Sequence, residues 1–143
     1  MVALENARRK AQAARAEAPE GAHVLAVDTV VALDGAVHGK PADAEEARAT
    51  LRALGGRTHE VIGGVVLDDQ ATLAVTRVTF RELDDALIDW YLATEEWRER
   101  AGGYAIQGRG AALVRAIDGD YLNVVGLPVA ALLDVLETSA FRR

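Results

Sequence analysis

The stretch that decides the fold is VLAVDTVVALDGAVH, residues 24–38. Apart from Asp28, residues 24–33 have the apolar character of a strand that is covered on both faces. Asp34-Gly35 is a strong signal for a two-residue hairpin. The sequence therefore predicts a buried strand that turns at Asp34-Gly35 and returns through residues 36–38.

Asp28 is the first candidate functional residue, because burial of a carboxylate is costly unless a cation, a metal or hydrogen bonds compensate. If Leu33 pairs with Ala36, simple register returns Lys40, within a Gly-Lys-Pro sequence, to the Asp28 end of the hairpin. Asp28 could then bind a divalent metal or take a proton from an attacking water, while Lys40 neutralises phosphate oxygens. A structural ion pair is the alternative interpretation.

Composition bounds the remaining choices. The chain has 143 residues, a formal net charge of −6 and no cysteine. This length is most simply one domain over residues 1–143, and the absence of cysteine excludes disulfides and cysteine-based zinc sites. The acidic balance argues against binding nucleic acid polymers, and no apolar run is long enough for a membrane span. We therefore expect a soluble, cytoplasmic protein.

Helices and strands are predicted to mix without strict alternation, which indicates an α/β or α+β class with a mixed sheet. We expect helices over residues 3–17, from the Asp43 cap to Gly55, from Asp84 or Asp85 to about Thr94, and from Pro128 through Leu136. Further strands are expected over residues 58–67, 71–80 and 111–117, and an extended run over residues 121–125.

Other polar positions suggest ligand contacts. Thr58 and His59 enter an apolar strand and could line a pocket, where a histidine would suit an anionic ligand, although the glycines before them also serve as a helix cap. Gln107 lies in a glycine-rich segment and could read the edge of a base, although a tight surface turn is the alternative. Thr29 could bond a ligand or simply pack in its strand.

Five strings, in one order and at matching spacing, resemble the Maf family: DTVV at 28–31, GKP at 39–41, GRTHEV at 56–61, YAIQG at 104–108 and GDYLNVVGLP at 119–128. Members of this family are nucleoside triphosphate pyrophosphatases. The resemblance implies a mixed sheet with flanking helices around a cleft, like that of the inosine triphosphatases. It also implies metal-dependent cleavage between the α and β phosphates, and the HEV string and Gln107 resemble the branch that acts on dTTP and UTP.

The resemblance assigns roles to single residues. Asp28 matches the family's proton acceptor, Lys40 matches the lysine of its Gly-Lys-Pro motif, and Lys10 matches a lysine on the preceding helix. Thr29 and Gln107 match positions linked to substrate choice. The implied cofactor is Mg²⁺ or Mn²⁺, with Asp28 as a ligand, and related proteins suggest a homodimer.

One departure from the family pattern concerns the N-terminus. Members open with a strand and a Ser-x-Ser-Pro-Arg-Arg loop that grips the triphosphate, and no Ser-Pro-Arg occurs in this chain. We therefore expect an N-terminally truncated member. The alternative to an active pyrophosphatase is a catalytically impaired relative that acts as a nucleotide-binding or interaction module, or an inert truncation product.

Overall fold

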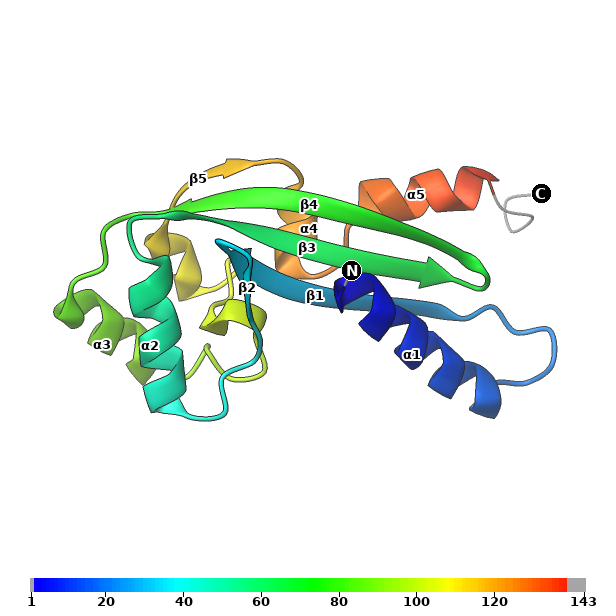
Figure 1. Ribbon diagram of the computed structural model, residues 1–143, viewed down its shortest axis with the longest axis horizontal. Helices are drawn as coiled ribbons and strands as arrows, with labels where there is room; N and C mark the ends of the chain where they lie inside the picture. The colour runs from blue at the N-terminus through cyan, green and yellow to red at the C-terminus, as the bar shows by residue number, and fades with distance from the viewer. Residues whose placement is uncertain (1, 139–143) are drawn as a thin grey trace. The chain divides into compact units, whose positions relative to one another are not determined.

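The computed structural model describes residues 2–138, in which helices and strands mix along the chain (Figure 1). The strands form one sheet in the order β2-β1-β3-β4-β5, and the predicted α/β class is confirmed. The helices are α1 (Val2–Glu17), α2 (Ala44–Leu54), α3 (Asp85–Ala93), α4 (Tyr121–Val125) and α5 (Val129–Thr138), with short 3₁₀ helices at Ala101–Gly103 and Arg109–Leu113. The strands are β1 (Leu25–Leu33), β2 (Ala36–His38), β3 (Thr58–Leu67), β4 (Gln70–Phe80) and β5 (Val114–Asp118).

The β1–β2 hairpin forms as the sequence predicts. Asp34 and Gly35 both adopt positive φ, 51° and 80°, as the central residues of a type I′ turn require. Leu33 pairs with Ala36 in an antiparallel ladder that ends at the Val31–His38 pair. Lys40 therefore follows two residues after the last paired residue of β2.

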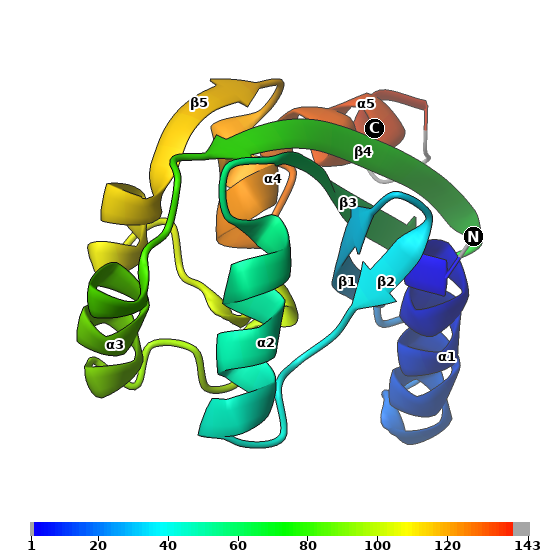
Figure 2. The ribbon, with the colours of Figure 1, turned by 60° about the vertical axis from the view of Figure 1, so that its left-hand side comes forward.

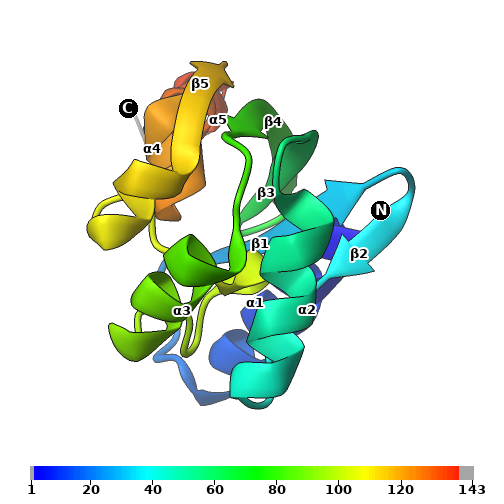
Figure 3. The same ribbon diagram turned by 90° about the vertical axis from the view of Figure 1, so that its left-hand side faces the viewer.

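Helices α2 and α3 begin where the acidic caps predict. The Asp43 carboxylate accepts a hydrogen bond from the backbone N–H of Glu46 at 2.8 Å, and Asp84 accepts one from Leu87 N–H at 2.8 Å. Each cap satisfies an N–H group that has no partner within its helix. Figures 2 and 3 show α2 and α3 side by side. The buried face of α2 includes Ala47, Leu51 and Leu54.

Two predictions near the C-terminal part are wrong. The strand expected over residues 111–117 begins only at Val114, because the preceding residues form a 3₁₀ helix. The extended run expected over residues 121–125 is the short helix α4, although Val and Tyr favour strands. Asp120 caps this helix by accepting from Leu122 N–H at 2.8 Å. The buried Asn123 donates to Ala74 O at 3.2 Å, a tertiary bond that a local pattern does not reveal.

The chain divides into two compact units that are each discontinuous in sequence. One, here called the Asp28 unit, contains the described parts of residues 1–29, 62–75 and 120–143. The other, the Gln107 unit, contains residues 30–61 and 76–119. The prediction of a single domain over residues 1–143 is not tested by this division and stays a prediction. Among the described helices, none is both long and apolar enough to cross a membrane.

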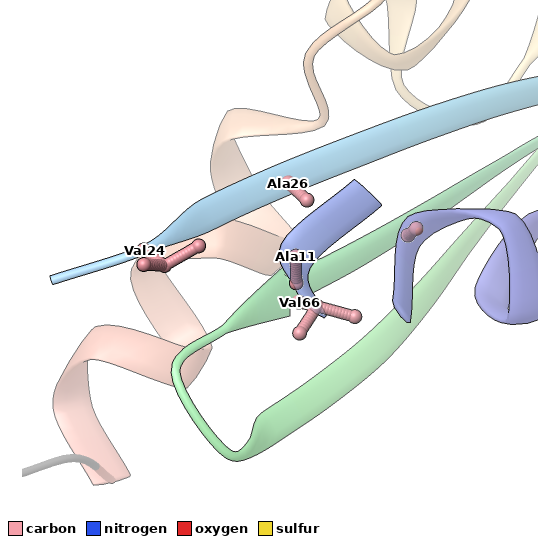
Figure 4. Packing of buried hydrophobic residues seen from close by; sticks show 5 residues of the cluster. Ala11, Val24, Ala26 and Val66 are labelled. Atoms are coloured by element: carbon pink, nitrogen blue, oxygen red, sulfur yellow. The ribbon is translucent and has the colours of Figure 1, made fainter. Parts of the chain in front are cut away.

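Within the Asp28 unit, small residues bring α1 close to the strands. Ala11 packs with Val24, Ala26 and Val66 in a cluster of buried side chains (Figure 4). A Cβ atom added to Gly64 would lie only 2.6 Å from the backbone of Ala3. A larger residue at either position would therefore push the helix away from β3.

A carboxylate in the turn between β3 and β4 holds the other end of α1. Asp68 accepts from Val24 N–H at 2.8 Å and from Arg15 Nη2 at 3.2 Å. Its Oδ2 also lies 2.8 Å from His23 Nδ1. These bonds, that from His23 above all, lower the pKa of Asp68, so the carboxylate is ionised at neutral pH. The last turn of α1 is thus tied to the turn of the sheet.

Candidate functional site

The structure brings two of the three predicted catalytic residues into direct contact. Asp28 lies on β1 with its side chain 16% exposed, so the carboxylate keeps some contact with water. Lys10 Nζ, on α1, lies 2.7 Å from Asp28 Oδ1 and 3.3 Å from Val27 O. Lys10 and Asp28 therefore form an ion pair within the Asp28 unit, and their catalytic roles stay predictions.

Asn6 is a third member of this cluster, and sequence reasoning missed it. Its Nδ2 donates to Asp28 Oδ2 at 3.0 Å, so both carboxylate oxygens accept a hydrogen bond from α1. Asn6 and Lys10 are four residues apart and hence lie on one face of the helix. An asparagine on a helix surface gives no sequence signal for such a bond, because asparagine side chains are mostly exposed and hydrogen-bond to water equally well.

The Lys10–Asp28 pair orients the carboxylate more than it stabilises the fold. Lys10 is 54% exposed, so solvent screens the interaction. Pairs of this kind contribute about 0–1 kcal/mol to folding. The geometry instead leaves a carboxylate of fixed orientation beside a solvent-accessible ammonium group. Such a cluster can hold a proton acceptor and an anion-binding cation together.

Lys40 belongs to the Gln107 unit, where its side chain is 62% exposed and its Nζ lies 3.9 Å from Glu99 Oε2. The preceding residue, Gly39, accepts through its carbonyl from Gly102 N–H at 3.1 Å. The Gly-Lys-Pro segment is therefore anchored to the start of the glycine-rich segment. The predicted convergence of Lys40 with Asp28 stays a prediction.

His59 lies in the core of the Gln107 unit. The residue is 1% exposed, its Nε2 lies 2.7 Å from Tyr104 Oη, and its ring meets Phe80 edge-on at 4.9 Å between centroids. Burial lowers the pKa of His59 to about 4, so the ring is neutral at neutral pH. A neutral, enclosed imidazole does not suit an anionic ligand. His59 therefore lies in the core as a neutral ring, and the substrate role predicted for it stays a prediction.

Thr58 and Thr29 are more accessible. Thr58 is exposed, and its Oγ1 lies 2.7 Å from Thr79 Oγ1 on the neighbouring strand. Thr29 is half-buried and follows Asp28 on β1, so its side chain points to the opposite face of the strand. The substrate roles of both threonines stay predictions.

Gln107 is exposed, whereas Tyr104 and Ile106 before it are buried at 6% and 5% exposure. The side chain thus extends from a loop whose earlier residues are buried in the core.

The Glu96 carboxylate, which sequence reasoning also missed, accepts from Arg109 N–H at 3.0 Å and from Gly110 N–H at 3.2 Å. Burial alone would raise the pKa of Glu96, but these bonds outweigh it and lower the pKa.

A metal site made of protein side chains alone does not occur within residues 2–138, where no three histidine, cysteine or carboxylate side chains gather. The residues fit a divalent metal only in the manner of Mg²⁺, which is commonly held by one or two carboxylates together with substrate phosphates. Asp28 would supply one such carboxylate. The metal itself stays a prediction.

Comparisons with known proteins identify the family that the chain resembles. The profile of the Maf family, described as Maf-like protein, matches residues 1–139. The chain is 51% identical over 118 residues to the dTTP/UTP pyrophosphatase of Pyrococcus furiosus, which covers 80% of this chain and 62% of that protein. It is 43% identical over 139 residues to the dTTP/UTP pyrophosphatase of Pyrococcus abyssi, covering 94% of this chain and 74% of that protein. For the enzyme of the same name from Myxococcus xanthus, the identity is 49% over 134 residues, with 92% and 68% covered.

Proposed function

This chain belongs to the Maf family, and we propose that it is a nucleoside triphosphate pyrophosphatase acting on dTTP and UTP. Relatives at 43–51% identity carry that name, although the chain spans only 62% of the Pyrococcus furiosus protein. The observation that carries the proposal is the Asp28 carboxylate, fixed by Lys10 and Asn6 while still in contact with water.

In the proposed reaction Asp28 takes a proton from an attacking water. The bond between the α and β phosphates breaks, which gives a nucleoside monophosphate and pyrophosphate. Lys10, whose ammonium group is solvent-accessible, neutralises charge on the phosphate oxygens. Lys40 is proposed to do the same. A divalent cation held by Asp28 and the phosphates would supply further charge neutralisation.

Substrate choice is assigned to Gln107, with contributions from Thr29 and Thr58. Gln107 is exposed and carries both a donor and an acceptor, as reading the edge of a base requires. A cytoplasmic location and a homodimer remain predictions.

The test is pyrophosphate release from dTTP and UTP by the purified protein, with Mg²⁺, with Mn²⁺ and with a chelator. Asp28→Asn should lower the rate roughly 10²- to 10⁴-fold, the range expected for loss of a general base. Asp69→Asn is the matched control, because Asp69 is exposed in the turn between β3 and β4. Equal pyrophosphate release by the wild type and Asp28→Asn would show that Asp28 is not the base.

A nucleotide-binding module without turnover is the second candidate. It is favoured by the same cluster, because both Asp28 oxygens already accept hydrogen bonds and a structural role would explain them as well. Titration calorimetry that detects dTTP binding, in a sample that releases no pyrophosphate with either metal, would support this candidate over the first.

A further inference from the structure

The loop that carries Gln107 is held on both sides of this residue. Ala105, two positions before it, donates its N–H to Tyr91 Oη at 2.9 Å. Arg109 and Gly110, just after it, donate their N–H groups to the Glu96 carboxylate. All of these residues belong to the Gln107 unit.

The two acceptors are joined to each other. Tyr91 Oη donates to Glu96 Oε1 at 3.2 Å. The Tyr91 side chain is fully buried on α3, and burial raises its pKa, so the hydroxyl keeps its proton. We call Tyr91 and Glu96 the loop clamp. It fixes the backbone on either side of Gln107 from a single rigid helix and the residues that follow it.

Glycines let the loop reach the clamp. A Cβ atom added to Gly108 would lie 2.6 Å from either oxygen of the Glu96 carboxylate. At Gly110 it would lie 2.3 Å from Ala105 O. Distances this short do not occur between real atoms. A side chain at Gly110 would meet backbone atoms, so only glycine fits there, whereas a side chain at Gly108 would displace the Glu96 carboxylate. The glycine-rich composition therefore serves the contact with Glu96.

A freely moving glutamine side chain can present either its donor or its acceptor to a base. Selection between bases therefore requires that the backbone carrying the side chain be fixed. Thymine offers an acceptor at O4 where cytosine offers an amino donor at N4. We propose that Glu96, together with Tyr91, is a positioning residue that holds Gln107 where it distinguishes the bases of nucleoside triphosphates. This inference rests on the proposed function, and the loop clamp itself touches no nucleotide.

The experiment compares kcat/KM for dTTP with kcat/KM for dCTP. Glu96→Gln removes the charge of the carboxylate, and Tyr91→Phe removes the hydroxyl while keeping the ring. Each should lower the preference for dTTP about tenfold, the loss typical of a charge-assisted hydrogen bond, and should do so chiefly through KM. Glu95→Gln is the matched control, because Glu95 is exposed and pairs only with Arg98 in the described contacts. It should keep the wild-type preference.

A role that is merely structural would affect both nucleotides alike, and a double-mutant cycle separates the two cases. In a Gln107→Ala background the preference is already lost, so adding Glu96→Gln should lower it no further. An unchanged preference in both Glu96→Gln and Tyr91→Phe would overturn the proposal. So would an equal further fall in the Gln107→Ala background. If Glu96→Gln does not fold, as judged by its thermal melt, Tyr91→Phe carries the same test.

Failure of the proposed function is distinguishable from failure of this inference. If the wild type releases no pyrophosphate from any nucleotide, the proposed function falls. The preference is then measured as the ratio of Kd values for dTTP and dCTP by calorimetry, with the same variants. A wild-type protein that binds both nucleotides equally, or neither, would overturn the positioning role.

Discussion

Asp28 lies within an apolar strand and His59 at the start of one, yet the two units give them opposite surroundings. Asp28 receives two polar partners from a helix and stays partly in water. His59 is enclosed by aromatic rings, and burial lowers its pKa to about 4. A polar residue in an apolar run therefore has two outcomes, and its partners decide between them. An ionised group stays accessible for chemistry where a solvated cation lies beside it, whereas a neutral ring can be buried in the core.

The largest expected effect concerns the Asp28 side of this comparison. Lys10→Met keeps the length of the side chain but removes its charge, and it should lower pyrophosphate release roughly 10²- to 10³-fold, as loss of a preorganised charge does. The thermal melt should change little, because the Lys10 side chain is exposed and solvent screens its charge. Arg9→Met, which removes an exposed charge from the same helix, is the control. A rate equal to that of the control would remove Lys10 from the proposed site.

The next prediction tests whether His59 belongs to the core. Its folded pKa, about 4, lies below the ordinary value of 6.5, so the unfolded chain binds more protons as the pH falls below that value. Stability from the neutral ring is complete above pH 6.5 and is lost as the pH falls towards 4. Between pH 7.5 and pH 5 this amounts to about 2 kcal/mol of unfolding free energy.

Denaturant unfolding at the two pH values measures this loss. His59→Gln provides the comparison, because glutamine can still bond Tyr104 but does not titrate in this range. The variant should be less sensitive to acid than the wild type by about the amount predicted. Identical pH dependence in the two proteins would mean that His59 gains a proton without cost and is more open than the structure shows.

Asn6→Leu should have a smaller effect on catalysis. It removes one of the two bonds that orient the Asp28 carboxylate and leaves Lys10 in place. We expect about a tenfold fall in kcat with little change in KM, because one charge-assisted hydrogen bond is lost. The readout is steady-state pyrophosphate release, and Asn6→Asp is informative because a second carboxylate beside Asp28 should be worse than leucine. An unchanged kcat in both variants would mean that Asn6 contributes to packing alone.

The smallest expected effect concerns Thr58. Thr58→Val removes the hydroxyl that faces Thr79, and cross-strand pairs of this kind contribute roughly 0.2–1 kcal/mol. If Thr58 also meets the nucleotide, KM for dTTP should rise severalfold at unchanged kcat. Thr79→Val breaks the same pair from the other strand and serves as the control. Equal KM values in the two variants would leave Thr58 with a structural role alone.

The sequence predicts those parts of the fold that depend on neighbours in the chain. The Asp34-Gly35 turn and the Asp43 cap each act within four residues, so their chemistry is visible in the sequence. The sequence does not predict helix α4. The Asp120 cap and the bond from Asn123 to Ala74 on a distant strand outweigh the strand preference of the residues in this helix.

The candidate site shows the same division. Asp28 stands out because a charge in an apolar run is unusual, and Lys10 and Gln107 follow from the family resemblance. Asn6 and Glu96 leave no comparable signal, since Asn6 bonds Asp28 across 22 residues of sequence and Glu96 bonds Arg109 across 13. Only the folded chain shows that Gly108 lies against the Glu96 carboxylate and Gly110 against the carbonyl of Ala105.

Ala3 lies close to Gly64 at one end of α1, and Asp68 bonds the other end. Together these contacts fix the rotation of the helix as well as its distance from the strands. The buried stripe of Ala3, Ala7 and Ala11 runs one residue out of step with Asn6 and Lys10. Each residue turns a helix by about 100°. A single residue inserted between Ala7 and Lys10 would therefore rotate the ammonium group about a quarter-turn away from the carboxylate, so a change in the length of α1 would separate the pair even if every original residue were kept.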